Sequence, residues 1–242
     1  VAAAMMIPLW MPSAAHADTP VAWGLSVFAT IDVGVAYQSA GAPRGDNSAG
    51  FLEYQAFTTT RNFTGSQTTL AENALEQSKV GAALSEELGQ SGFSVIGRIE
   101  TAFDPLSGKL VDACGSLADN GGRGSPASPR GQTVNFDSSR CGQAINGVAF
   151  GGIASKRFGV LTFGRQVSLI QEALAIYDPQ TTAPAFSIFG YSGFEGGAGS
   201  TEAARIDNSF KYVFFTDRLR VAALYSRGGK GSGILGKTYM LQ

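Results

Sequence analysis

The sequence predicts an all-β fold, a transmembrane antiparallel β-barrel, from three observations. Apolar and polar residues alternate over several windows of about ten residues, the length that a tilted membrane strand needs. The links between these windows are short and long in turn. The first residues have the pattern of an export signal, which indicates an extracytoplasmic protein.

Composition excludes several other classes of protein. Of the 242 residues only 15% are charged, whereas soluble domains have roughly 25%. The net charge of −1 is unsuited to nucleic acid, which requires a basic surface. One His and two Cys cannot supply a four-ligand structural zinc site without help from carboxylates. We therefore expect no metal, no cofactor and no nucleic-acid partner.

The N-terminus predicts a signal peptide over residues 1–17, with its charged first region missing. An apolar run covers residues 2–11, and Ala15 and Ala17 are small residues at the positions that signal peptidase reads before Asp18. The alternative is a loosely packed N-terminal helix. Cleavage would remove His16, the only histidine, and with it Ser-His-Asp and Cys-His catalysis. Since the sequence also contains no Gly-x-Ser-x-Gly elbow, we expect no enzyme.

Alternation of period two predicts about seven strands in the mature chain. In the first window, Leu25, Val27 and Val35 share one face and Asp32 lies on the other. The windows are residues 25–37, 79–85, 93–103, 145–153, 158–166, 204–215 and 219–225. The third window places Arg98 and Glu100 opposite an apolar face, and the sixth places Ile206, Phe210, Tyr212 and Phe214 together on one face. Trp23 and Tyr37, at opposite ends of the first strand, suit the aromatic girdles of a membrane barrel.

The lengths of the links distinguish two interpretations of this alternation, a membrane barrel and a soluble β-sandwich. Long links cover about residues 38–78, 104–144 and 167–203, and every short link falls at the opposite end of the strands. Outer-membrane barrels have short periplasmic turns and long external loops, while a soluble sandwich has no reason to sort its loops. Alternation alone also fits a sandwich, with the apolar face in the core.

Four motifs then resemble Gram-negative general porins, especially the betaproteobacterial type. Residues 26–37 resemble their first strand, and residues 79–89 are similar to their second strand and turn. Residues 158–166 resemble the strand F-G-x-[LV]-x-[LF]-G-R-Q before their third loop, and residues 205–212 resemble their R-x-x-N-S-x-x-Y strand. The resemblance covers residues 26 to about 229, with the loops unmatched.

This resemblance implies a 16-stranded barrel, a homotrimer in the outer-membrane bilayer, which lets small hydrophilic solutes and ions diffuse through a pore narrowed by the third loop. It places Lys79, Arg165 and Arg205 on a basic wall of the constriction, with Lys79 where the family has Arg. The wall position of Arg98 opposite the apolar face makes it a further candidate. The third loop lacks the family's usual acid at residues 184–190, which leaves Asp178 and Glu195 as its acidic candidates.

Cys114 and Cys141 both fall in the second long link. An even number of cysteines in an exported chain suggests a disulfide, which would stabilise that loop by roughly 3–4 kcal/mol in the entropic model. The alternative is that the two thiols are unpaired.

The length of the chain predicts that it contains only a part of the 16-stranded family fold. Residues 18–242 hold about seven strands, and an open set of strands leaves unpaired edges that lipid cannot satisfy. We therefore expect the N-terminal portion of a porin. Two alternatives remain: an eight-stranded non-conducting barrel with an extra strand in residues 50–57, and a secreted β-sandwich adhesin or binding module.

Overall fold

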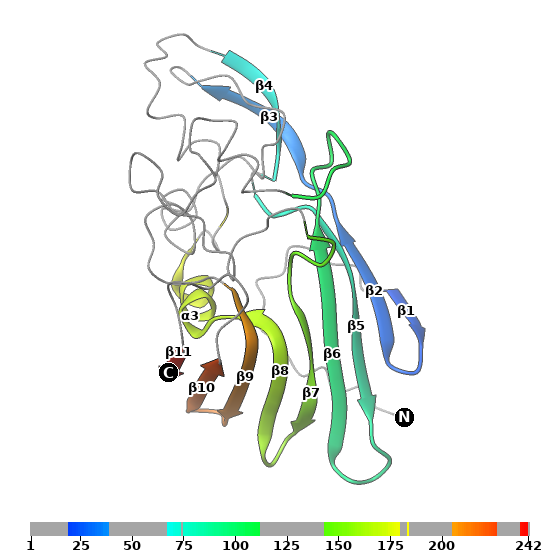
Figure 1. The fold of residues 1–242 in the computed structure, drawn as a ribbon, viewed down its shortest axis with the longest axis vertical. Coiled ribbons are helices and arrows are strands. Elements are labelled where there is room, and N and C mark those ends of the chain that lie inside the picture. Colours follow the sequence, from blue (N-terminus) through cyan, green and yellow to red (C-terminus); the bar gives the residue numbers. More distant parts are fainter. Residues whose placement is uncertain are drawn as a thin grey trace.

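The computed structural model describes residues 19–38, 67–73, 75–111, 143–179, 183, 205–226 and 238–241. These residues form a nine-stranded sheet in the order β1-β2-β5-β6-β7-β8-β9-β10-β11, a separate two-stranded sheet β3-β4, and the helix α3 (Figure 1). The strands are β1 (Thr19–Ala22), β2 (Leu25–Thr30), β3 (Val33–Gln38), β4 (Gln67–Glu72), β5 (Lys79–Glu87), β6 (Phe93–Ala102), β7 (Ala149–Ser155), β8 (Gly159–Val167), β9 (Arg205–Phe215), β10 (Arg220–Ser226) and β11 (Thr238–Leu241); α3 is Leu169–Tyr177.

Every pairing in the large sheet is antiparallel; β5 pairs with β2, and from β5 to β10 consecutive strands pair with one another. The four turns that join β1 to β2, β5 to β6, β7 to β8 and β9 to β10 lie at one end of the strands (Figure 1), and the strand ends that the long links join lie at the other. This sorting of short and long links is the one that the sequence predicts. Within the described residues β1 and β11 do not pair, so the sheet is open. The extra strand considered for residues 50–57 lies outside the described residues.

The first predicted strand is wrong in its continuity, because the chain breaks between β2 and β3. Ile31 and Asp32 are not in a strand, and β3 leaves the large sheet to pair with β4. The Asp32 carboxylate accepts hydrogen bonds from the backbone N–H groups of Leu75 (2.6 Å) and Glu76 (2.9 Å). An Asp side chain that binds nearby backbone competes with the sheet ladder, which accounts for the break.

Polar groups hold the chain together where the break between β2 and β3 lies against residues 73–78, a place called here the crossing. Ser78 Oγ accepts the N–H of Asp32 at 2.9 Å, and Asn73 Oδ1 accepts the N–H of Ser78 at 2.6 Å. Both Asn73 and Ser78 are completely buried. The crossing therefore fixes where β5 begins, and so the position of Lys79.

None of the described helices is long and apolar enough to cross a membrane.

Candidate functional site

The two faces of the large sheet differ in chemistry. One face, here called the polar face, bears Arg98, Glu100, Thr162, Ser209 and Lys211. The other, the apolar face, bears large hydrophobic side chains in register from strand to strand, such as Val95–Ile153–Leu161–Tyr212 and Phe163–Phe210.

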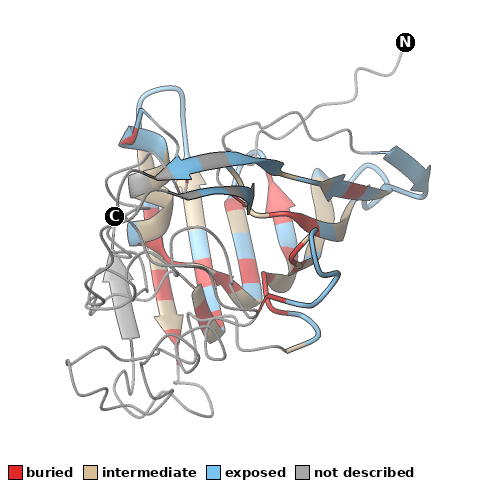
Figure 2. Cartoon of the chain, turned by 90° about the horizontal axis from the view of Figure 1, so that it is seen from above, coloured by how far each residue is buried: buried red, intermediate tan, exposed pale blue. Residues whose placement is uncertain are grey.

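The polar face is the buried one. Phe163, Phe210 and Ile99 of the apolar face are 55%, 54% and 50% exposed, whereas Glu100 and Lys211 are 5% and 9% exposed. Figure 2 shows the resulting stripes of buried and exposed residues along the central strands. A soluble sandwich buries its apolar face, so it would show the reverse. Lipid is the environment in which an exposed apolar face beside a buried polar one is stable.

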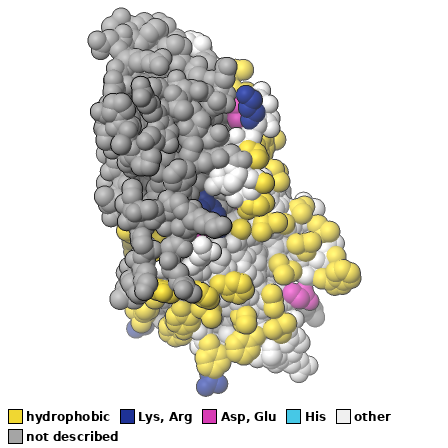
Figure 3. All heavy atoms as spheres, viewed as in Figure 1, with side chains coloured by type: hydrophobic (Ala, Val, Ile, Leu, Met, Phe, Trp, Pro, Cys, Tyr) yellow, Lys and Arg dark blue, Asp and Glu magenta, His cyan; other side chains and the backbone are white. Residues whose placement is uncertain are grey.

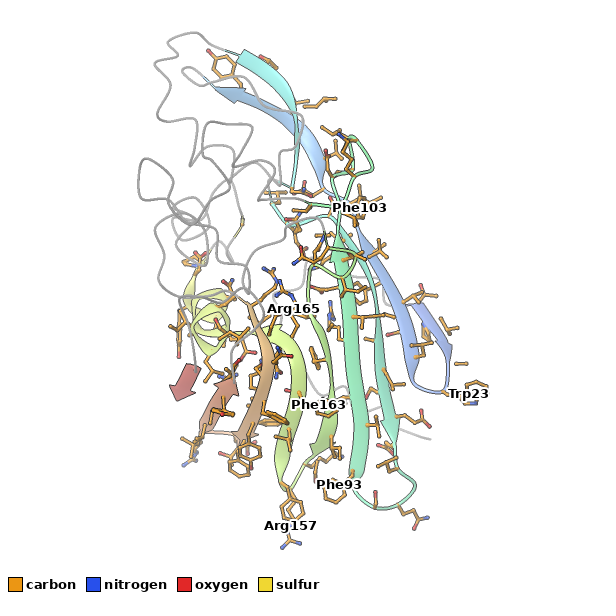
Figure 4. All side chains as sticks on the ribbon, viewed as in Figure 1. Trp23, Phe93, Phe103, Arg157, Phe163 and Arg165 are labelled. Atoms are coloured by element: carbon orange, nitrogen blue, oxygen red, sulfur yellow. The ribbon has the colours of Figure 1, made fainter. Side chains whose placement is uncertain are left out.

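Aromatic residues mark the short-turn end of the strands. The rings of Phe93 and Phe158 stack with their centroids 5.9 Å apart, and Tyr212 Oη donates to the Phe158 carbonyl at 2.7 Å. Trp23, in the β1–β2 turn, is 88% exposed. Figure 4 places Trp23 and Phe93 at this end, and Figure 3 shows hydrophobic side chains gathered over the same part of the strands. These rings fit the girdle that membrane barrels place at the bilayer interface.

Lys79 begins β5 on the polar face and is 9% exposed. Its Nζ lies 2.7 Å from Oε1 of Glu76. The backbone N–H of Glu76 in turn donates to the Asp32 carboxylate, which holds Glu76 in place. The Lys79 charge is therefore compensated locally, by a carboxylate that sequence reasoning did not select.

Arg98 lies on β6, two residues from Glu100 on the same face. Its Nε is 3.3 Å from Glu100 Oε2, and its guanidinium carbon lies 4.1 Å from the ring centroid of Phe28 on β2. The contact with Phe28 depends on Gly81, because a Cβ there would collide with that ring. The positive charge of Arg98 is thus held between a carboxylate and an aromatic face.

Arg165 lies at the long-link end of β8 (Figure 4). Its Nη1 contacts Asp207 Oδ1 at 2.6 Å, its Nε donates to the Gly147 carbonyl at 2.7 Å, and its Nη2 donates to the Asn146 carbonyl at 3.3 Å. The guanidinium therefore ties β8 to β9 and to the segment that enters β7, in addition to carrying charge.

A β-bulge beside Arg165 changes which residues share a face. Asp207 and Asn208 stand opposite Arg165 alone, and Asn208 has a φ of 50°. A bulge inserts one residue and so reverses the alternation beyond it. Ile206 consequently lies on the polar face, and its predicted place beside Phe210 is wrong.

The remaining candidates lie near or outside the described residues. Arg205 begins β9 opposite Val167 and is half-buried. Asp178 follows α3 directly and is 5% exposed. Glu195, Cys114 and Cys141 lie outside the described residues.

The helix α3 is the feature that sequence reasoning missed. Ser168 Oγ accepts the N–H of Gln171 at 3.2 Å, and the Ser168 carbonyl accepts the N–H of Glu172 at 3.1 Å. Ser168 is therefore the N-cap, and Ser-x-x-Gln before an apolar run is a helix-start signature that the sequence does contain. The apolar residues that follow the cap are spaced for a helix instead of a strand.

The helix packs on the polar face, against β9 and β10. Leu169, 2% exposed, forms a cluster with Ile206, Ala222 and Leu224. The Glu172 carboxylate lies between two cations of the sheet: Oε1 contacts Lys211 Nζ, and Oε2 is 2.6 Å from Arg220 Nη2. The start of the third long link thus turns over the polar face of the strands.

Comparison with known proteins agrees with this architecture. The model of the family described as Gram-negative porin matches residues 1–239. The anion-selective porin from Comamonas acidovorans has a similar structure, with a TM-score of 0.52 and 15% identity over 84% of this chain and 46% of that one. OmpT, an outer membrane protein of Vibrio cholerae, matches with a TM-score of 0.37 and 14% identity over 84% of this chain and 40% of that one.

A search of curated proteins finds no match. The chain spans less than half the length of each of these two solved structures. The match over residues 1–239 nevertheless decides its family. The protein belongs to the Gram-negative porin family and is located in the outer membrane.

Proposed function

We propose that the protein contributes to a passive diffusion channel for small hydrophilic solutes and ions. The polar face forms the wall of a water-filled lumen, and α3 is the start of an inward-folded third loop that narrows it. The single observation that carries this proposal is the reversed burial of the sheet: charged residues lie on its sheltered face and apolar ones on its exposed face. Such a channel needs no nucleophile or cofactor, because conduction requires only weak binding.

The charges of the wall support a constriction. Lys79 and Arg98 lie on the polar face, at or toward the long-link half of their strands. Arg165 and Arg205, the other members of the proposed basic side, lie at the long-link ends of β8 and β9. The register places Arg165 opposite Ala149, in the row of Ile99, so its place on the wall belongs to the proposal. Asp178, next to α3, and Glu195 are the acidic candidates of the loop. Lining charges act strongly here because a narrow water channel in a low-dielectric barrel concentrates their field.

The ion pairs of the wall also bear on selectivity. Within the described residues, Lys79, Arg98, Arg165, Lys211 and Arg220 form ion pairs with four carboxylates, Glu76, Glu100, Asp207 and Glu172. The paired groups therefore leave one positive charge in excess. We propose a weak preference for anions.

Planar-bilayer recording of the complete porin tests the proposal. We expect ohmic single-channel steps and a reversal potential, in a potassium chloride gradient, of the sign that anion preference gives. A protein that inserts but does not conduct would contradict the channel. A clear cation preference would contradict only the charge argument.

The partners remain part of the proposal. The bilayer of the outer membrane covers the apolar face, and a homotrimer follows from the family resemblance. Sedimentation or cross-linking of the complete porin in detergent tests the trimer, and a monodisperse monomer would overturn it.

A further inference from the structure

Glu172, on the helix that covers part of the polar face, makes contacts that differ in kind from those of the other charged residues there. It lies in the first turn of α3, and its two carboxylate oxygens contact different strands: Lys211 on β9 and Arg220 on β10. All three side chains are partly shielded from water, with exposed fractions of 24%, 11% and 33% respectively.

The other ion pairs of the wall are local or lie within the sheet. Glu76 and Lys79 are three residues apart, and Arg98 and Glu100 are neighbours on the same face of one strand. The pair of Arg165 with Asp207 joins two adjacent strands. Among the described ion pairs, only those of Glu172 connect the helix of the long link to the wall.

The groups around Glu172 make it a strong attachment point. Lys211 Nζ also donates to the Val167 carbonyl at 3.1 Å, which fixes the ammonium at the junction of β8 and α3. On the same face of the helix, three residues earlier, Leu169 packs into the cluster with Ile206, Ala222 and Leu224. The first turn of α3 is thus held by an apolar cluster and by two ion pairs, and both ion pairs depend on the Glu172 carboxylate.

We propose that Glu172 is the positioning residue that sets both the width and the charge of the pore at this wall. It holds α3 against β9 and β10, and it neutralises one of the two cations that it contacts. This inference rests on the proposed channel function and adds a residue that determines how the channel conducts. It predicts that loss of the Glu172 carboxylate changes both the width and the ion selectivity of the pore. Loss of both its cationic partners should change the width in the same way and the selectivity in the opposite direction.

The experiment compares variants of the complete porin in planar bilayers at two salt concentrations. At about 1 M salt the Debye length is about 3 Å, so that conductance reports mainly the width of the pore. At about 0.1 M salt it is about 10 Å, so that the ratio of anion to cation permeability reports the wall charge. Glu172→Gln removes the shared carboxylate and keeps the size of the side chain.

We expect Glu172→Gln to raise the high-salt conductance about twofold, because α3 is released, and to shift permeability toward anions, because two cations lose their partner. The double variant K211Q/R220Q removes both cations instead. It should raise the high-salt conductance in the same way and shift permeability toward cations. Equal widening with opposite selectivity shifts is a signature that a simple change of wall charge does not produce.

One control completes the design. Glu86→Gln removes an exposed carboxylate near the β5–β6 turn whose register partner, Val95, lies on the apolar face, and it should change neither quantity.

The outcomes distinguish a failure of the proposed role of Glu172 from a failure of the proposed channel function. If the wild type inserts without conducting, the proposed function fails. If the wild type conducts and neither Glu172→Gln nor K211Q/R220Q changes the high-salt conductance, the channel stands and the positioning role of Glu172 is overturned. Because the two variants are independent, a folding defect in one leaves the other to decide.

Discussion

The part of the polar face that α3 covers differs from the part that it leaves open. Beneath α3 the sheet presents Ile206, Ala222 and Leu224, which pack on Leu169. Away from the helix, over β5 and β6, the same face presents Lys79, Arg98 and Glu100 with their ion pairs. Beside this cluster, α3 also covers Lys211 and Arg220, whose charges are compensated by Glu172 of the helix. Over β5 and β6, carboxylates of the sheet and of the preceding segment compensate the cations instead. Charges on both parts indicate that this face of the sheet does not meet lipid, which disfavours charged side chains.

The opposite face of the sheet gives the prediction with the largest effect. Phe163→Arg places a charge on the apolar face in the middle of β8, where a membrane barrel loses about 2–4 kcal/mol. Leu88→Arg is the matched control, because Leu88 is 46% exposed but lies beyond the end of β5, in the short turn. We expect Phe163→Arg to lower the yield of folding into lipid vesicles and Leu88→Arg to leave it unchanged. Equal tolerance of both variants would favour a soluble sheet.

The covered part is tested by Leu169→Ala. Removing a fully buried Leu costs about 2–3 kcal/mol here, at the lower end for such sites because the cluster is small. The loss should appear as faster amide hydrogen exchange in α3, with the strands β5 and β6 unaffected. Ile176→Ala in the same helix is the control, because Ile176 is 41% exposed. If both variants loosen α3 equally, the cluster does not hold it.

The part of the polar face over β5 and β6 is tested by Arg98→Gln. The substitution removes the contact with Phe28 and leaves the buried Glu100 without this partner, at a cost of about 1–3 kcal/mol. The expected readout is a lower urea midpoint in detergent, without faster exchange in α3. Arg157→Gln provides the comparison, since Arg157 is exposed and its 5.2 Å contact with Phe158 contributes about 0.5–1 kcal/mol at an exposed site. Faster exchange in α3 would mean that the two parts are coupled.

The smallest effect is expected at the crossing that positions Lys79. Asp32→Ala removes two hydrogen bonds to backbone N–H groups, which costs about 1–2 kcal/mol. Amide exchange should rise in β3 and β4 and stay unchanged in β7 and β8. Asp217→Ala, in the exposed β9–β10 turn, serves as the reference with no expected change. No change in β3 and β4 would show that the crossing does not depend on Asp32.

The sequence predicts the strands well because a membrane sheet repeats one simple rule, the alternation of apolar and polar residues. Windows such as residues 93–103 and 204–215 correspond to β6 and β9 within a few residues, and the sorting of the links is confirmed. The rule fails where one side chain or one inserted residue overrides it. Asp32 ends β2 by binding backbone across the crossing, and Asn208 reverses the alternation at Ile206.

The site is less predictable than the fold, because a charge on a strand says nothing about its partner. The alternation gives Arg98 its face, but the pairing of Arg165 with Asp207 depends on the bulge, and that of Lys79 with Glu76 depends on the crossing. The role of Glu172 depends on a helix, which alternation of period two does not predict. The sequence Ser-x-x-Gln at residues 168–171, typical of a helix start, was the available signal.

The central claim is that the polar face meets water and the apolar face meets lipid. Ala82 and Ala83 test it most directly, since they are adjacent, similarly half-buried and in the middle of β5. Ala82 pairs with Val27 and Ile99 of the apolar face, and Ala83 pairs with Ser26 and Arg98 of the polar face.

The measurement uses Ala82→Cys and Ala83→Cys in the complete porin in lipid bilayers, with serine at both native cysteine positions. A charged, membrane-impermeant thiol reagent should label position 83 and reduce conductance there, and should leave position 82 unlabelled. Labelling of position 82 in preference to position 83, or equal labelling of both, would contradict the account.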